Sequence, residues 1–423
     1  MTGVDFLLAN CSEIVSPIGG GHPLRGPQLG RLKRVERAAL VARNGVIVDW
    51  GPERQVLGRI EKLPGCVEVD AGGCSVIPGL VDPHTHAVFG RARPEEYAAR
   101  IEGRSYVEIA AAGGGIHSSV RDLRSRSEDE LLELTVPRLL RMLAHGTTTL
   151  EIKSGYGLTT EDELKTLRVI RRLSDRVPQT LVATFLGAHE MPLDFRDRRQ
   201  EYMELVIEEM IPLAAELADF NDVFCEPSVF TLEESERVLR AGARHGLAPK
   251  LHADELESCG AAELGCRLGA VSADHLVRVS EAGVRALADS DTVAVLLPGT
   301  SFGLALPDYA PARKLIEAGA IVALATDFNP GSSHGPSMQA TWSLACSMMR
   351  MTPDEALTAC TLNAAHAVGK SDTLGSLEPG RRCDLVVTHG SDYRAVPYHF
   401  GVNNARLVVQ NGRVVWSDRE TEQ

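Results

Sequence analysis

The sequence predicts an α/β protein that consists of a (β/α)8 barrel, or TIM barrel, and a small β-sandwich domain. Short apolar segments alternate with amphipathic helical segments through the middle of the chain, which is the pattern of a parallel sheet covered by helices. Asn-Gly hairpins stand near both ends of the chain. We therefore expect residues 1–75 and 373–423 to form one composite sandwich domain, and residues 76–372 to form the barrel domain.

The two hairpins have the same form. Residues 39–48 and 407–416 each consist of two short segments rich in β-branched residues around an Asn-Gly pair. Asn-Gly is favoured in two-residue hairpin turns because both turn positions need a positive φ angle. A further strand is expected at residues 383–387.

About eight strand–helix units follow, the number that closes a parallel barrel. After the strand that precedes His84, strands are expected at 147–153, 181–185, 222–225, 249–252, 270–274, 292–297 and 321–326. Helices are expected between them, for example at 128–144, which begins with a capping-box pattern at Ser127. An open doubly wound sheet is the alternative, but no Gly-x-Gly-x-x-Gly follows a predicted strand, so nothing indicates a dinucleotide site.

Composition narrows the class of protein. The chain has 423 residues, of which 44% are hydrophobic and 24% charged, and its net charge is −13. That charge argues against nucleic acid or an anionic membrane as the main partner. There is no signal-peptide pattern and no apolar run near the roughly 18 residues of a membrane span. The nine cysteines form no Cys-x-x-Cys motif, which predicts reduced thiols in a cytoplasmic protein.

The segment His84-Thr85-His86 is the strongest chemical signal. It follows the apolar run at residues 75–81, which is expected to be a buried strand. Alternate residues of a strand share one face, so both imidazoles are expected to point to the same place. Neutral imidazole is a good ligand for zinc or iron, and the pair is therefore a candidate half of a metal site.

More polar side chains follow the other predicted strands. A barrel carries its chemistry at the carboxyl ends of its strands, so these residues are expected to meet. They are Lys153, Tyr156, His189, His252, Glu255, His275, Asp327 and Asn329. Five histidines and two carboxylates at such positions favour a metal hydrolase over core packing.

Their chemistry predicts roles. His84, His86, His252 and Asp327 supply nitrogen and oxygen ligands, and the metal would lower the pKa of a bound water. Asp327 could accept the proton of that water, His275 could stabilise an oxyanion, and Glu255 could hold or protonate a ring nitrogen. Lys153 is ambiguous: a structural ion pair with one metal is favoured, and a carboxylated lysine that bridges a second metal is the alternative.

With these motifs the chain resembles the amidohydrolase superfamily and, within it, the imidazolonepropionase family of histidine degradation. The motifs include Gly-Leu-Val-Asp-Pro-His84-Thr-His86, Lys153-Ser-Gly-Tyr156-Gly, His252-Ala-Asp-Glu255 and Asp327-Phe-Asn329-Pro-Gly331-Ser332-Ser. The resemblance covers nearly the whole chain. It implies one zinc or iron ion on His84, His86, His252 and Asp327. It also implies substrate contacts from Arg93, Tyr106, Tyr156, His189, Glu255, Asn329, Gly331 and Ser332, and frequent assembly as a homodimer.

The reaction implied by this resemblance is hydrolysis of the ring carbon–nitrogen bond of 4-imidazolone-5-propanoate, which gives N-formimidoyl-L-glutamate. Arg93 would bind the propionate because a guanidinium pairs with a carboxylate in a bidentate manner. Another cyclic amidase or a deaminase of the same superfamily would share the metal ligands and is the alternative enzyme. A catalytically silent metal-binding protein would be expected to lack Asp327 or His275, and both residues are present.

Overall fold

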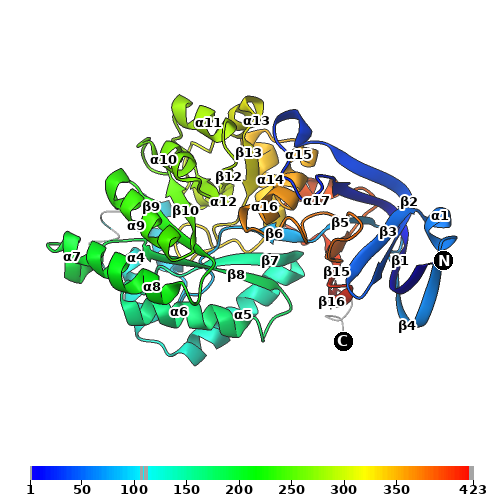
Figure 1. The fold of residues 1–423 in the computed structure, drawn as a ribbon, viewed down its shortest axis with the longest axis horizontal. Coiled ribbons are helices and arrows are strands. Elements are labelled where there is room, and N and C mark those ends of the chain that lie inside the picture. The colour runs from blue at the N-terminus through cyan, green and yellow to red at the C-terminus, as the bar shows by residue number, and fades with distance from the viewer. Residues whose placement is uncertain (1, 105–107, 109–112, 419–423) are drawn as a thin grey trace.

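The computed structural model describes residues 2–104, 108 and 113–418, and these residues form two sheets of eight strands each (Figure 1). One sheet has the order β13-β12-β11-β10-β9-β8-β7-β6 and comes from the middle of the chain. The other has the order β16-β15-β14-β5-β1-β2-β3, with β4 beside β1, and comes from both ends. The predicted fold class, a barrel with a sandwich-like domain of terminal strands, is therefore confirmed.

The barrel sheet is parallel throughout, and it is nearly closed on itself. Its strands are β6 (Leu80–Asp82), β7 (Thr147–Lys153), β8 (Thr180–Ala188), β9 (Phe220–Cys225), β10 (Ala248–Ala253), β11 (Ser272–His275), β12 (Val293–Leu296) and β13 (Ile321–Leu324). A bridge between Thr85 and Phe328 joins the segments that follow β6 and β13. The predicted strand at 147–153 matches β7, and the other predictions differ from the observed strands by a few residues at their ends.

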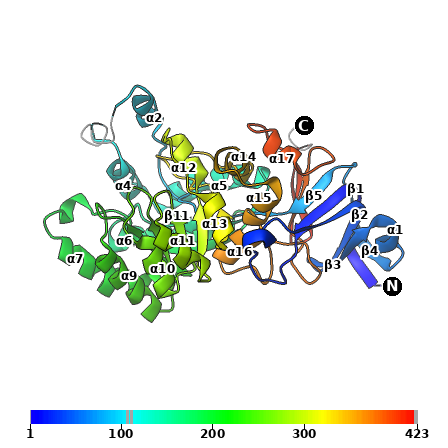
Figure 2. The ribbon, with the colours of Figure 1, turned by 90° about the horizontal axis from the view of Figure 1, so that it is seen from above.

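Helices surround this sheet on its outer side (Figures 1 and 2). They are α2 (Pro94–Ile101), α4 (Ile116–Arg124), α5 (Glu128–Ala144), α6 (Thr160–Leu173), α7 (Arg199–Glu204), the π-helix η3 (Leu205–Met210), α8 (Ile211–Ala214), α9 (Leu232–Arg244), α10 (Ala261–Leu268), α11 (Glu281–Ala288), α12 (Pro298–Gly303), α13 (Ala312–Ala318), α14 (Met338–Met349), α15 (Pro353–Ala359) and α16 (Leu362–Ala367). The capping box predicted at Ser127 is present at the start of α5, with Glu130 as its partner.

The terminal sheet is built from both ends of the chain, because β14 pairs with β5, and both views show blue and red segments together in this part of the molecule (Figures 1 and 2). Its elements are β1 (Thr2–Pro17), β2 (Leu32–Arg43), β3 (Val46–Pro52), β4 (Ile60–Asp70), β5 (Ser75–Pro78), β14 (Leu385–Thr388), β15 (Ala405–Gln410) and β16 (Arg413–Ser417), with the short helices α1 (Glu53–Leu57) and α17 (Ala395–Tyr398) beside them. Both predicted hairpins are present. All four turn residues have positive φ, between 51° at Asn411 and 76° at Gly45.

The run at residues 75–81, expected as one strand, is divided between the two sheets at Gly79. β5 pairs with β1 and β14 in the terminal sheet, whereas β6 pairs with β7 in the barrel. A Cβ atom at Gly79 would lie 2.4 Å from Thr148 Oγ1, so the absence of a side chain lets the chain cross closely over β7. The domain boundaries at 75/76 and 372/373 stay a prediction.

Most apolar side chains of the barrel belong to one core between the strands and the surrounding helices. A separate core of the terminal sheet contains Phe6, Leu40, Trp50 and Leu385. All nine cysteines lie among the described residues and are free thiols. Of the helices in the described part of the chain, none is long and apolar enough to cross a membrane.

Candidate metal-dependent active site

The pair His84 and His86 lies just beyond the end of β6, where the barrel sheet closes. His86 N donates a hydrogen bond to Phe328 O at 2.9 Å, and Asp327 N donates one to His84 O at 3.1 Å. These backbone bonds hold the two histidines beside the segment that follows β13. Both side chains are buried, and their ring centroids lie 5.3 Å apart.

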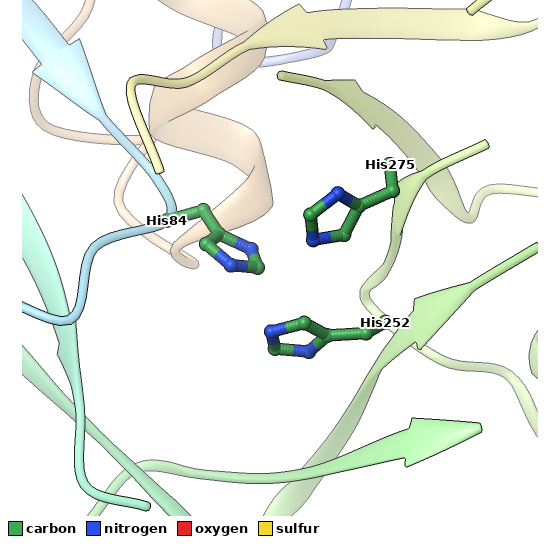
Figure 3. A group of neighbouring side chains, drawn as sticks. All are labelled: His84, His252 and His275. Atoms are coloured by element: carbon green, nitrogen blue, oxygen red, sulfur yellow. The ribbon is translucent and has the colours of Figure 1, made fainter. Parts of the chain in front are cut away.

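Two further histidines approach the pair from β10 and β11. His252 is on β10 and His275 is the last residue of β11. Figure 3 shows the rings of His84, His252 and His275 turned toward one another, and the ring centroids of His84 and His252 are 4.5 Å apart. His252 Nε2 lies 3.4 Å from His86 Nε2.

Asp327 completes this cluster of ligand atoms. Its Oδ1 lies 3.6 Å from the Nε2 atoms of both His84 and His86. Its other oxygen accepts a hydrogen bond from Thr300 Oγ1, which leaves Oδ1 directed at the histidines. Asp327 has a φ of 51°, an uncommon angle for a residue other than glycine, and such angles often occur at functional sites.

This donor set fits a metal ion. Two nitrogen ligands at 2.0–2.1 Å from a tetrahedral ion lie about 3.4 Å apart, close to the separations just given. His84 Nε2 and His275 Nε2 are buried without a hydrogen-bond partner among the described residues. Burial lowers the pKa of His84 and His86 well below the ordinary value, which favours the neutral form that binds metal.

Carboxylates behind the histidines set their orientation. His84 Nδ1 is 2.6 Å from Asp274 Oδ2, and His252 Nδ1 is 3.2 Å from Asp222 Oδ1. With the proton on Nδ1 facing the carboxylate, each ring presents the lone pair of Nε2 to the site. Other groupings of donors are also within reach, one of them being His86, His189 and His252, whose ligand atoms lie within 4.8 Å of one another.

Glu255 enters the site on a loop after β10. Glu226 holds this loop, because its Oε1 accepts hydrogen bonds from Glu255 N at 2.7 Å and Leu256 N at 2.9 Å. Glu255 Oε1 lies 3.5 Å from His275 Nδ1. Burial, and then the Asp327 carboxylate, raise the pKa of Glu255 to about 8. A carboxyl group with that pKa carries a proton at neutral pH.

The loop after β7 places Tyr156 next to His189. The buried carboxylate of Glu163 accepts three hydrogen bonds from backbone N–H groups of this loop, at 2.7 to 2.9 Å. The Tyr156 ring centroid lies 5.8 Å from that of His86 and 5.4 Å from that of His189. Burial and the nearby His252 lower the pKa of His189 to about 3, so its imidazole is neutral.

Arg93 and the loop after β13 lie beside one another. Asn329 Oδ1 accepts hydrogen bonds from Gly331 N and Ser332 N, each at 2.8 Å. Arg93, Gly331 and Ser332 line a cavity of about 680 Å³. Burial raises the pKa of Tyr156; the Arg93 guanidinium acts against this rise and the Asp327 carboxylate adds to it.

The sequence-predicted residues therefore gather in one region, with Tyr106 lying outside the described residues. Sequence reasoning missed the residues that hold them in place: Asp222, Glu226, Glu163 and the role of Asp274. A signal was present for Asp222, because a carboxylate within a buried strand must find a buried partner. Glu163 and Glu226 gave no comparable signal, since their partners are backbone amides.

Comparison with known proteins shows which protein family the chain belongs to. A model of the amidohydrolase family matches residues 75–415, and the chain belongs to this family. Among solved structures, guanine deaminase of E. coli aligns with a TM-score of 0.74 at 14% identity, over 97% of this chain and 98% of that one. A zinc-bound adenosine deaminase from Xanthomonas campestris aligns with a TM-score of 0.71 at 18% identity, over 99% and 94%. At these identities the likeness shows the fold alone.

Curated relatives narrow the assignment. The imidazolonepropionase of Geobacillus thermodenitrificans is 48% identical over 93% of both chains. Those of Symbiobacterium thermophilum and Porphyromonas gingivalis are 47% and 44% identical, each over 98% of both chains. Within the amidohydrolases, the chain belongs to the imidazolonepropionase family.

Proposed function

We propose that this chain hydrolyses the ring carbon–nitrogen bond of 4-imidazolone-5-propanoate to N-formimidoyl-L-glutamate, a step in histidine degradation. The observation that carries the proposal is the convergence of His84, His86, His252 and Asp327 in a chain nearly half identical to imidazolonepropionases. His86 Nε2 lies 3.4 Å from His252 Nε2, and Asp327 Oδ1 lies 3.6 Å from the Nε2 atoms of His84 and His86. These four residues would hold one zinc or iron ion. When bound, the ion lowers the pKa of a water molecule and polarises the carbonyl that is attacked.

Three residues would handle protons and charge. Asp327 would also accept the proton of the attacking water. His275 Nε2, which has no partner among the described residues, is free to donate to the oxygen of the tetrahedral intermediate. Glu255, protonated at neutral pH, would pass its proton to the departing ring nitrogen. These three residues are the proposed catalytic residues.

The opposite end of the substrate carries a carboxylate. We propose that Arg93 binds this carboxylate. Arg93 lines the cavity together with Gly331 and Ser332. Asn329 shapes that loop, and the backbone N–H groups of Gly331 and Ser332 already point to its Oδ1. Tyr156, His189 and Glu255 complete the proposed substrate contacts of the described residues. Tyr106 stays a prediction from the family resemblance.

Location and assembly are further proposals. The free thiols support a reducing compartment, the cytoplasm. We expect a small-molecule substrate, no nucleic-acid partner and no membrane partner, and a homodimer as in the family. Sedimentation velocity of the purified protein checks the last point, and a monomer at micromolar concentration would contradict it.

The test of the proposed reaction is product identification. Fresh 4-imidazolone-5-propanoate is given to the purified protein, its absorbance is followed, and the product is identified by mass spectrometry. We expect N-formimidoyl-L-glutamate. Ammonia release without ring opening would instead indicate a deaminase, and turnover only of other cyclic amides would indicate a different amidase.

A further inference from the structure

A fully buried lysine lies behind the metal ligands. Lys153 ends β7 and its side chain has no solvent exposure. Its Nζ lies 2.7 Å from Glu151 Oε1, 2.7 Å from Asp222 Oδ2 and 3.8 Å from Asp274 Oδ2. A buried ammonium needs such partners, because an unpaired charge is strongly unfavourable away from water. Lys153 touches none of the groups to which the proposed function gives a chemical task.

Two of these carboxylates have a second partner that is a metal ligand. Asp222 uses its other oxygen, Oδ1, to contact His252 Nδ1 at 3.2 Å. Asp274 uses Oδ2 to contact His84 Nδ1 at 2.6 Å. A single ammonium is thus connected, through one aspartate each, to two imidazoles that come from opposite parts of the barrel. In each case the contact is at Nδ1, which leaves Nε2 for the metal.

We propose that Lys153 is a positioning residue of the metal site, which holds the Asp222 and Asp274 carboxylates in place and through them fixes the orientation and tautomer of His252 and His84. The inference rests on the metal site of the proposed function, since without an ion on these imidazoles their tautomers have no chemical consequence. It assigns to Lys153 a role other than carrying a bridging carbamate.

The surroundings of Lys153 oppose that alternative role. Carboxylation of a lysine needs the neutral amine. Burial alone would lower the pKa of Lys153, but Asp222, Glu151 and Asp274 raise it above its ordinary value, so the ammonium form persists. A carbamate on Lys153 would also place a fourth negative group next to three carboxylates. Lys250 would then be the nearby cation that faces these groups, with its Nζ 3.5 Å from Glu151 Oε1. Lys153 therefore supports the ligands of one metal ion and does not carry a carbamate that bridges two ions.

The direct test is the zinc affinity of Lys153→Met, measured on metal-free protein by competition with a chromophoric chelator. Groups that orient metal ligands typically contribute 10- to 100-fold in affinity, and we expect a loss of about that size. The matched control is Lys165→Met, another largely buried lysine, which pairs with Asp162 at 2.6 Å on α6 and has no contact with the histidines. We expect its zinc affinity to equal that of the parent. Equal affinity for Lys153→Met and the parent, or equal losses in both variants, would overturn the inference.

A second variant covers the case in which Lys153→Met does not fold because it leaves buried carboxylates unpaired. Lys153→Met combined with Glu151→Gln removes both charges of one ion pair and leaves the Asp222 and Asp274 carboxylates unchanged. We expect this double variant to fold, by circular dichroism, and still to bind zinc about 10- to 100-fold more weakly than the parent. Parental zinc affinity in the double variant would contradict the positioning role.

Zinc binding by the parent protein and by His84→Ala distinguishes a failure of this inference from a failure of the proposed function. Tight binding of one zinc ion by the parent, lost in His84→Ala, supports the site itself, and the Lys153 variants then decide the positioning role. A parent that binds no zinc or iron, or that binds it equally well after His84→Ala, would refute the proposed site and with it the role of Lys153.

Discussion

Arg93 lies directly against the backbone of Gly331. A Cβ atom on Gly331 would be 1.7 Å from Arg93 Nη2, so no side chain fits there while the guanidinium keeps its place. Arg93 Nη1 is 3.1 Å from Glu96 Oε2, which holds the guanidinium on another side. The glycine at position 331 thus makes room for the group that we assign to the substrate carboxylate.

Gly331→Ala should therefore raise the KM for 4-imidazolone-5-propanoate on the order of tenfold and change kcat much less, because overpacking displaces Arg93 and not the reacting centre. Steady-state kinetics measure this. Gly335→Ala, in the wall of the same cavity, is the control, since a Cβ there meets no described atom within 4 Å. An unchanged KM for Gly331→Ala would show that the contact does not matter to substrate binding.

Arg93→Lys should also raise KM more than it lowers kcat. A lysine ammonium cannot reproduce the planar bidentate pair of a guanidinium with a carboxylate, and the lost charged hydrogen bond corresponds to a KM on the order of tenfold higher. Arg91→Lys, at an exposed position two residues away, should leave KM unchanged. If both substitutions have the same effect, Arg93 does not contact the propionate.

Glu255→Gln should keep the metal and lose most of the activity. Glutamine preserves the shape of the side chain but cannot transfer a proton, and general acids and bases contribute typically 10²–10⁴-fold, so kcat should fall by about that factor. Metal content is measured beside kcat. Loss of the metal would show that Glu255 supports the metal ligands. A kcat within a few-fold of the parent value would show that Glu255 is not a catalytic residue.

The stability of the metal-free protein should depend on pH through Glu255. Burial and Asp327 raise the pKa of this carboxyl from 4.5 to about 8. The folded chain keeps a proton that the unfolded chain releases near pH 4.5. The stabilisation is therefore fully present below that pH and is lost as pH rises to about 8, by at most about 1.4 kcal/mol per pH unit.

Urea unfolding of the metal-free parent and of metal-free Glu255→Gln, at a series of pH values from 5 to 9, measures this contribution. The parent should lose free energy of unfolding relative to the variant as pH rises, because glutamine does not titrate. Parallel curves for the two proteins would mean that Glu255 titrates near its ordinary pKa.

The barrel and the histidine cluster were predictable because they depend on patterns along the chain. Apolar segments with polar residues at their carboxyl ends mark parallel strands, and the shared edge of those strands brings His84 and His252 together. The division of residues 75–81 into β5 and β6 was not predictable, because it depends on the close approach of Gly79 to Thr148. Nothing in the local pattern shows which residue of β7 will lie there.

The supporting carboxylates illustrate the same limit. Asp222 and Lys153 lie on β9 and β7, and their contact arises only when the sheet curves into a barrel. Glu226 accepts hydrogen bonds from backbone N–H groups of the Glu255 loop. Many polar side chains could accept such bonds, so the presence of a glutamate at position 226 does not predict its partner. Chemistry-bearing residues can thus be found from sequence, whereas the groups that orient them require the folded structure.

The most direct test of the central claim is a titration of metal-free protein with Zn²⁺ or Fe²⁺, with activity toward 4-imidazolone-5-propanoate measured at each step. The cluster of His84, His86, His252 and Asp327 predicts that activity rises linearly and reaches a plateau at one ion per chain, and that His84→Ala shows no rise. A plateau at two ions per chain, or full activity in the metal-free protein, would contradict a single-metal hydrolase.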